Sequence, residues 1–331
     1  MEQIQGTVQP IAGINSDSIE LALTSEMLAI CEPLRYAVTA EQSTLRKGIL
    51  ENAVLALDNF ITRWKSKNPK IDNNVLEAIS LRREGIHSLL NIMADEPRLP
   101  TLIYEQFLAL ENIPSQIAAA IEQNRLERGL VPTRYSLLNH LAEIVSAQNY
   151  LEIGCCRNDC FNAISCPQKV GVDPISGGTL RMTSDEFFQF NAQIFDLIFI
   201  DGLHESWQVD KDIEHALHWS SPQALIVLHD CNPLFEVRSL VPRLTETWNG
   251  DVWKSLVRIR SREDLDCATG MFDHGCAVIC KRPNSAPINS VPDNALSWSN
   301  LVMNRKSWIR PMSYNELITW VTASSSSPIN H

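Results

Sequence analysis

Two continuous apolar runs, each followed by acidic and histidine side chains, constrain this chain more than any other feature. Residues 195–204 read FDLIFIDGLH, and residues 224–230 read ALIVLHD. Such runs are typical of parallel strands that are covered on both faces of a sheet. Because ligands bind outside the carboxyl ends of these strands, we predict a functional site there. The candidate residues are Asp201, His204, His229 and Asp230.

The rest of the segment from residue 131 to residue 322 alternates strands with helices. Short strand patterns at 149–154 and 169–173 precede the two apolar runs. This alternation predicts a doubly wound, Rossmann-like α/β sheet that is mostly parallel. Two late runs, at 265–271 and 275–280, predict an antiparallel pair that closes the sheet. The residues at 252–259 fit a helix or a strand, and those at 283–300 are expected to form a surface loop.

Helical spacing dominates residues 1–130, in which apolar positions recur every three or four residues. We predict a separate helical region there, acting as a cap or as a dimerisation element. A homodimer formed through this region is one interpretation, and a helical decoration without chemistry of its own is the other. The serine-rich segment at 323–331 is expected to be a disordered tail.

Composition narrows the classes of partner. The formal net charge of −11 over 331 residues argues against sequence-independent nucleic-acid binding and against docking on an anionic membrane. No membrane span or signal pattern is present, so a cytoplasmic location is expected. The nine cysteines include no C-x-x-C pair, which favours reduced thiols over a zinc site.

The first strand ends in a candidate ligand-binding motif. Glu152 and Gly154 close this strand, and Asp173 closes the next one about 20 residues later. A glycine lets the backbone approach a ligand, and a carboxylate at the second position accepts hydrogen bonds from ribose hydroxyls. A surface turn before Pro174 is the alternative for Asp173. The full G-x-G-x-x-G fingerprint is absent, which argues against a pyrophosphate ligand.

Together these motifs resemble those of class I S-adenosylmethionine-dependent methyltransferases, within a small-molecule branch. The resemblance runs from about residue 133 to residue 282 and rests on YLEIG (150–154), GVDP (171–174), MTSDEFF (182–188), VLHDCNP (227–233) and WNGDVWK (248–254). It implies S-adenosylmethionine as the methyl donor. It also implies cofactor contacts: Glu152 and Gly154 at the methionine and ribose portion, Asp173 at the ribose hydroxyls, Ser184 and Asp185 at the adenine, and Asp201 beneath the methyl group.

Methyl transfer needs a positioned nucleophile and a group that removes its proton. His204 and His229 are candidate general bases, and Asp201 is a candidate to orient them. Alternatively, Asp201 and Asp230 hold Mg²⁺, which would acidify an acceptor hydroxyl. The expected acceptor is an oxygen or nitrogen of a small molecule, such as a sugar or a secondary metabolite. Other classes left open are a nucleotide-dependent oxidoreductase and a non-catalytic binding protein on the same fold.

Overall fold

The computed structural model describes residues 16–40, 42–67, 73–92 and 96–323. The chain divides into two compact units, Met1–Asn124 and Arg125–His331. Apart from Ala323, the tail expected at 323–331 lies outside the described residues. None of the described helices is long and apolar enough to cross a membrane.

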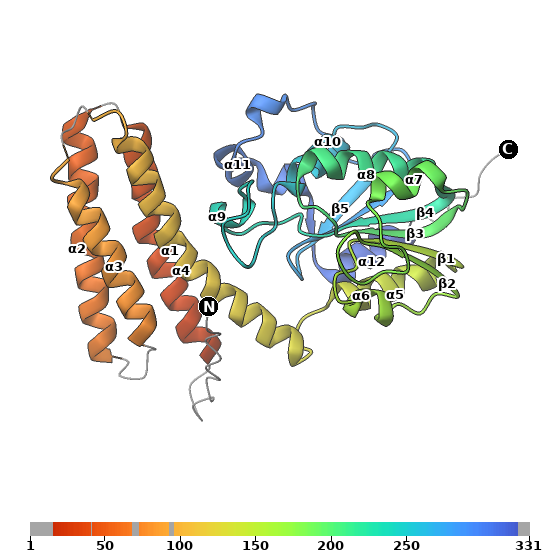
Figure 1. The fold of residues 1–331 in the computed structure, drawn as a ribbon, viewed down its shortest axis with the longest axis horizontal. Coiled ribbons are helices and arrows are strands. Elements are labelled where there is room, and N and C mark those ends of the chain that lie inside the picture. Colours follow the sequence, from red (N-terminus) through yellow and green to blue (C-terminus); the bar gives the residue numbers. More distant parts are fainter. Residues whose placement is uncertain (1–15, 41, 68–72, 93–95, 324–331) are drawn as a thin grey trace. The chain divides into compact units, whose positions relative to one another are not determined.

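The first unit is helical (Figure 1). It contains α1 (Ser16–Thr39), α2 (Ser43–Lys67), α3 (Asn73–Leu89) and most of α4 (Leu99–Glu127). The apolar positions that recur at helical spacing meet in one core, which includes the fully buried Met27, Leu57, Phe60, Ile86 and Phe107. The spacing of apolar residues therefore accounts for both the helices and their packing.

The second unit is built on a seven-stranded sheet with the order β2-β1-β3-β4-β6-β5-β7. Its strands are β1 (Asn149–Ile153), β2 (Gln168–Val172), β3 (Phe195–Ile200), β4 (Ser220–Leu228), β5 (Asp266–Gly270), β6 (Cys276–Cys280) and β7 (Pro311–Met312). Strands β2, β1, β3 and β4 are parallel, whereas β6 is antiparallel to both β4 and β5. The predicted mostly parallel, doubly wound sheet with an antiparallel late pair is confirmed.

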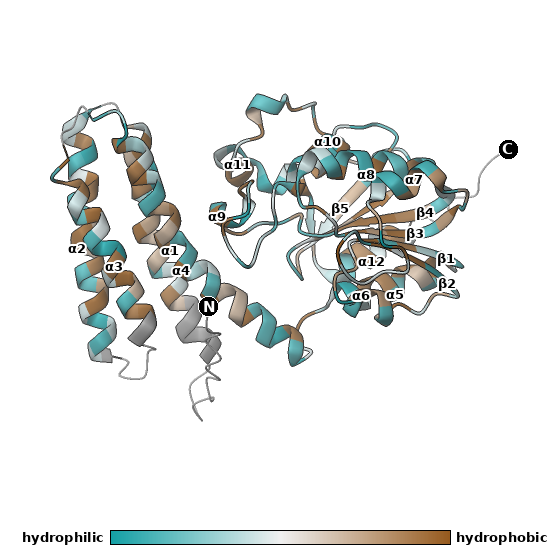
Figure 2. Cartoon of the chain, in the orientation of Figure 1, coloured by the Kyte–Doolittle hydropathy of each residue, from teal (hydrophilic) through white to brown (hydrophobic). Residues whose placement is uncertain are grey.

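Helices cover both faces of this sheet (Figure 1). One face carries α7 (Ser184–Phe190), α8 (Ser206–His218), α10 (Val252–Arg260) and α11 (Trp298–Ile309), and the other carries α5 (Arg134–Ile144), α6 (Asp159–Ala163) and α12 (Tyr314–Thr322). In β3, Ile198 and Ile200 pack on the first face, while Leu197 and Phe199 pack on the second. Burial on both faces explains the continuous apolar runs 197–200 of β3 and 224–228 of β4, and both strands carry hydrophobic stretches in Figure 2.

Local signals at helix starts agree with the structure. Thr133 caps α5 by accepting a hydrogen bond from the Ser136 amide, and Thr183 caps α7 in the same way through Glu186. The ambiguous residues 252–259 form the helix α10.

The surface loop expected at 283–300 is only partly correct. It contains the short 3₁₀ helix η1 (Asp293–Ala295) and the start of α11, which the sequence analysis did not predict. Ser297 caps α11, and the buried Leu301, Trp308 and Ile309 hold this helix against the core. A further short helix, α9 (Glu236–Ser239), lies in the connection between β4 and α10.

Candidate active site

The parallel register brings the predicted residues together at the carboxyl ends of the strands. Ile153 of β1 pairs with Ile200 of β3, and Ile200 pairs with Leu228 of β4. The Asp201 amide donates to the Ile153 carbonyl over 2.8 Å, and the His229 amide donates to the Ile200 carbonyl over 3.1 Å. The polar residues that follow these strands therefore lie next to one another.

His229 lies at the centre of this cluster. Its Nδ1 atom is 3.0 Å from both Asp201 Oδ1 and Asp230 Oδ2, and its Nε2 atom is 3.3 Å from Asp273 Oδ1. The side chain is only 5% exposed. Burial lowers the pKa of this imidazole, but Asp201 and Asp230 raise it well above its usual value. Because both ring nitrogens contact carboxylates, His229 is held as a buried cation.

Its carboxylate partners show the reciprocal effect. Burial raises the pKa of Asp201, but His229 and His204 outweigh it and hold that pKa well below its usual range. The pKa of Asp230 is lowered by the same two histidines against the effect of burial. The acids are therefore ionised, and the histidines neutralise them.

His204 lies beside the same carboxylates but is more accessible. Its Nε2 atom is 3.4 Å from Asp201 Oδ1, its Nδ1 atom is 3.4 Å from Asp230 Oδ2, and the side chain is 21% exposed. Burial lowers the pKa of His204, but Asp230 and Asp201 raise it, with a net value of about 9. The ring also stacks on Trp248, with 5.3 Å between the ring centroids. His204 is thus close to buried carboxylates and is also partly exposed to solvent.

Two further members of the cluster, Asp273 and Arg134, were not predicted. The Arg134 amide donates to Asp273 Oδ2 over 2.7 Å, and its Nη1 atom donates to Asp273 Oδ1 over 2.8 Å. Asp273 is buried in the turn between β5 and β6, where its φ is +45°. A positive φ is unusual for a residue other than glycine and marks this position in the structure. The sequence gives no backbone angles, so this feature could not be used to predict Asp273. The neighbouring His274 ring lies edge-on to His229 at 5.9 Å.

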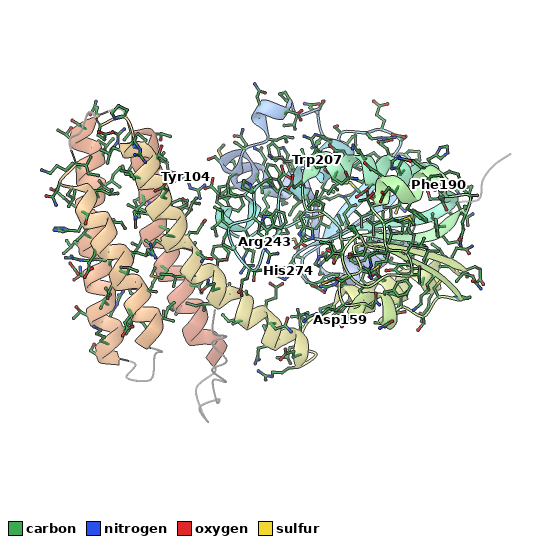
Figure 3. The ribbon with its side chains drawn as sticks, viewed as in Figure 1. Tyr104, Asp159, Phe190, Trp207, Arg243 and His274 are labelled. Atoms are coloured by element: carbon green, nitrogen blue, oxygen red, sulfur yellow. The ribbon has the colours of Figure 1, made fainter. Side chains whose placement is uncertain are left out.

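Figure 3 labels five side chains of the second unit: Asp159, Phe190, Trp207, Arg243 and His274. His274 and Arg243 lie toward the end where β3 and β4 finish, and Phe190, which precedes β3, lies at the opposite end. The candidate active site is therefore confined to the carboxyl ends of the parallel strands.

The loop after β1 depends on Gly154. This residue has φ of +89°, and its amide donates to the Val172 carbonyl over 2.9 Å. A Cβ atom there would overlap the Asp201 carbonyl group and Gly202. Only glycine allows the β1 loop to pass this close to the end of β3, and close approach of this loop to a ligand stays a prediction.

Asp173 joins the loops that follow β1 and β2. Its Oδ2 atom accepts the Cys156 amide over 2.9 Å, and its Oδ1 atom accepts the Ile175 and Ser176 amides, each over 2.8 Å. Burial opposes ionisation, but these backbone hydrogen bonds lower the pKa of Asp173. A carboxylate offers about four acceptor positions, and these three hydrogen bonds leave one on Oδ2, so contact of Asp173 with ribose hydroxyls stays a prediction.

Glu152 lies fully buried beneath the same loop. The Tyr150 hydroxyl donates to its Oε2 atom over 2.5 Å, and its Oε1 atom has no hydrogen-bond partner among the described residues. Burial raises the pKa of Glu152 to about 7, although Tyr150 and Cys160 lower it. A buried, unpartnered carboxylate oxygen suits a ligand that donates a hydrogen bond, such as the ammonium group of S-adenosylmethionine.

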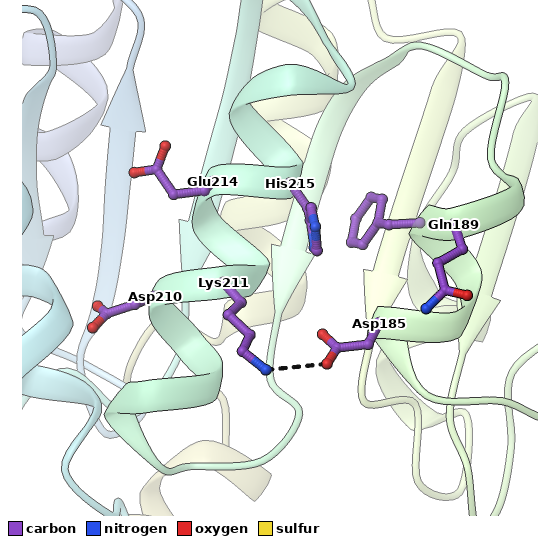
Figure 4. Close-up of a pocket in the computed structure, with 7 residues that line it drawn as sticks. Asp185, Gln189, Asp210, Lys211, Glu214 and His215 are labelled. Atoms are coloured by element: carbon purple, nitrogen blue, oxygen red, sulfur yellow. Dashed lines mark hydrogen bonds and ion pairs between the residues drawn. The ribbon is translucent and has the colours of Figure 1, made fainter.

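Ser184 and Asp185 do not join the cluster at the strand ends. Gln208 Nε2 of α8 donates to Ser184 Oγ over 3.3 Å and to Asp185 Oδ1 over 2.9 Å, and Lys211 contacts Asp185 over 3.2 Å. Asp185 also lines a surface pocket of about 580 Å³ between α7 and α8 (Figure 4). The residues lining this pocket include none of the predicted catalytic side chains. Adenine contact by Ser184 and Asp185 stays a prediction.

A metal site was the alternative at the strand ends. Asp201, His229 and Asp230 each offer one ligand atom, and these atoms lie within 4.8 Å of one another. Mg²⁺ prefers a set of oxygen ligands, whereas here the His229 nitrogen lies between the two carboxylates. The arrangement therefore does not match an all-oxygen magnesium site. Metal binding by Asp201 and Asp230 stays a prediction, and no catalytic step below depends on it.

Comparison with known proteins finds a family match that overlaps part of this site. A family model described as a methyltransferase domain matches residues 117–231, a segment that ends just after His229 and Asp230. The match supports the resemblance to methyltransferases over residues 117–231. No curated protein matches the chain.

Several solved structures are similar to the chain at low sequence identity. The O-methyltransferase from Bacillus cereus is 13% identical, with a TM-score of 0.34, and the match covers 68% of this chain and 97% of that one. The O-methyltransferase TomG from Streptomyces achromogenes is 15% identical, with a TM-score of 0.33, and the match covers 50% of this chain and 88% of that one. Similarities at this level do not assign a cofactor or a substrate to this chain.

Proposed function

We propose that the chain transfers the methyl group of S-adenosylmethionine to a hydroxyl or amine of a small molecule, with His204 as the general base. The observation that carries this proposal is the difference between the two histidines. His229 has both ring nitrogens beside carboxylates and is almost fully buried, whereas His204 is partly exposed next to the same acids. Only His204 is placed to meet an incoming acceptor.

His204 then takes the proton that the acceptor loses. Bound S-adenosylmethionine would supply an electrophilic methyl carbon to an acceptor held in line with it. As the acceptor oxygen or nitrogen forms its bond to that carbon, the bond between the carbon and the sulfonium sulfur would break and S-adenosylhomocysteine would leave, while the acceptor's proton would pass to the Nε2 atom of neutral His204. The nearby carboxylates of Asp201 and Asp230 stabilise the imidazolium that results.

His229 has a positioning role in this proposal. As a cation it offsets the charges of Asp201, Asp230 and Asp273, which surround it within 3.3 Å. Without it, three buried carboxylates would lie close together, and some would become protonated. His229 therefore keeps Asp201 and Asp230 ionised and in place beside His204.

On the opposite side of the site, Glu152, Gly154 and Asp173 would hold the methyl donor. Gly154 allows the close approach, Asp173 would accept the ribose hydroxyls, and Glu152 would accept a hydrogen bond from the ammonium group. Support comes from the positive φ of Gly154 and from the unpartnered oxygen of Glu152. Gly154 lies against Asp201 and Gly202 at the end of β3. It is therefore next to the residues that are proposed to act on the acceptor.

Calorimetry with S-adenosylhomocysteine tests this assignment. Losing charge-assisted hydrogen bonds in Asp173→Ala should weaken binding by about 1.5–3 kcal/mol. Asp173→Asn, which keeps an acceptor oxygen, should lose less. Asp159→Ala is the control, because Asp159 is exposed and pairs only loosely with Arg157 at 3.8 Å. Unchanged affinity in folded Asp173→Ala would rule out the ribose assignment.

The acceptor class is tested by transfer of a radiolabelled methyl group to a panel of phenols, catechols, amines and sugars. The acidic net charge of −11 supports such molecules over nucleic acid. We expect the wild-type protein to methylate at least one panel member and His204→Gln to methylate it at least about 10²-fold more slowly. A protein that binds S-adenosylhomocysteine but modifies no panel member would contradict this choice of acceptors.

A further inference from the structure

The segment at residues 248–251, between α9 and α10, contacts the ends of both β3 and β4. Its sequence, WNGD, is part of the family resemblance. The Asn249 and Gly250 amides donate to the Arg238 carbonyl of α9 over 2.9 and 3.0 Å. These bonds attach the segment to α9, so its contacts with the strand ends are made from a fixed backbone.

Its first contacts are with His204. The Trp248 carbonyl oxygen is 3.1 Å from His204 Nδ1, and the Trp248 indole stacks on the imidazole with an angle of 22° between the rings. The Asp251 amide also donates to the His204 carbonyl over 3.1 Å. Both the ring and the main chain of His204 are therefore held by this one segment.

Gly250 makes that approach sterically feasible. It has φ of +61°, and a Cβ atom at this position would overlap the His204 carbonyl oxygen. Any larger residue would move the segment away from His204 or strain the backbone. Position 250 therefore requires glycine because the segment passes so close to the main chain of His204.

The same segment also holds the neighbouring acid and the start of the next helix. Asn249 Nδ2 donates to Asp230 Oδ1 over 2.7 Å, and the Asn249 side chain is buried. Asp251 Oδ1 accepts the Ser206 amide over 2.6 Å at the start of α8, two residues after His204. Within four residues the segment therefore contacts both His204 and its partner Asp230.

We propose that Trp248 and Asn249 are positioning residues: Trp248 sets the tautomer and plane of His204, and Asn249 fixes Asp230 beside it. The Trp248 carbonyl accepts the Nδ1 proton, which leaves Nε2 as the nitrogen that takes a proton. Stacking on the indole stops the ring from turning away. The catalytic consequence rests on the proposed function, but the structural relation between Trp248 and His204 does not.

Nuclear magnetic resonance of the full chain, with its histidine ring carbons labelled, tests that structural relation without any acceptor. The chain has eight histidines, and His204→Gln identifies the His204 resonance. At fixed pH, Trp248→Leu should shift this resonance because the ring current of the indole is lost. Trp248→Phe, which keeps a flat ring, should shift it less. The control is Trp207→Leu, because Trp207 is an exposed tryptophan of α8 that bonds to Glu205 and should leave His204 unaffected.

Kinetics test the catalytic consequence, with the best acceptor from the panel above. A displaced base can lower the rate by about 10- to 100-fold, so kcat of Trp248→Leu should fall in that range while affinity for S-adenosylhomocysteine stays unchanged. Trp248→Phe should restore part of the rate. Asn249→Leu should lower kcat without changing that affinity, because Asp230 loses its donor.

Each outcome decides the proposal. An unmoved His204 resonance in Trp248→Leu, or an equal loss of rate in Trp207→Leu, would overturn it. If Trp248→Leu does not fold, Trp248→Phe compared with Trp207→Leu decides: a shift confined to the former supports the proposal, and no difference overturns it. If the wild type methylates no acceptor, the proposed function fails, and the resonance alone decides whether Trp248 holds His204.

Discussion

The carboxyl ends of β1 and β2 are built differently from those of β3 and β4. In the first region, Asp173 accepts hydrogen bonds from the backbone amides of Cys156, Ile175 and Ser176. In the second, ionised side chains contact one another, as His229 does with Asp201, Asp230 and Asp273. The first region is a backbone cradle, and the second is a network of charges.

This difference separates the two tasks of the proposed reaction. A cradle of backbone groups is suited to holding one ligand in one place, and its loss should change affinity. A buried charge network is suited to setting protonation states, and its disturbance should change rate and stability. Substitutions in the two regions are therefore expected to change different measured quantities.

The largest effect is expected from His204→Gln. Loss of a general base should lower kcat by about 10²–10⁴-fold, whereas affinity for S-adenosylhomocysteine should not change.

Because the pKa of His204 is about 9, the ring is mostly protonated at neutral pH, and the wild-type rate should rise with pH up to about 9. Steady-state kinetics between pH 6 and pH 10 check this. A rate that falls over that range, or a variant that keeps its activity, would contradict the role of His204.

The next effect is on stability, from Asp273→Asn. This change removes the charge that pairs with Arg134 and His229 in a buried setting and should cost about 3 kcal/mol in the free energy of unfolding. Urea unfolding at pH 7 measures it. Asp264→Asn is the matched control, because Asp264 pairs with Arg262 at the surface and should contribute less than about 1 kcal/mol. Equal losses in the two variants would show that the network does not stabilise the fold.

The smallest effect concerns Glu152→Gln in the cradle. Burial raises the pKa of Glu152 to about 7, so the folded state binds a proton that the unfolded chain releases from about pH 4. The contribution of protonated Glu152 to the free energy of unfolding of the wild type is fully present below about pH 4. It is lost as pH rises through about 7. Glu152→Gln should therefore unfold with about 2 kcal/mol more free energy than the wild type at pH 8. Unfolding at pH 4.5 and pH 8 checks this, and no difference between the two pH values would place Glu152 in a solvated site.

The two regions also differ in how far the sequence predicts them. The cradle follows from local patterns, because Glu152, Gly154 and Asp173 close adjacent strands and the contacts of Asp173 lie within 17 residues. The alternating strands are predicted for the same reason, since each pattern depends on neighbours along the chain.

The charge network is only half predicted. Asp201, His204, His229 and Asp230 follow apolar strands, so their meeting follows from the parallel register. Arg134 and Asp273 lie 139 residues apart, and no periodicity connects them. Trp248 belongs to the WNGDVWK segment of the resemblance, but its stacking on His204 was not predicted because it depends on how the loop after α9 returns to the sheet. Long-range pairing of this kind cannot be derived from spacing alone.

The central claim is that the cradle holds the methyl donor and presents its methyl group to the charge network. A crystal structure with S-adenosylhomocysteine tests it most directly. We predict ribose hydroxyls within hydrogen-bonding distance of Asp173 and a sulfur atom that faces the His204 side of the strand ends. A ligand bound in the pocket between α7 and α8, or one whose sulfur faces away from His204, would contradict this account.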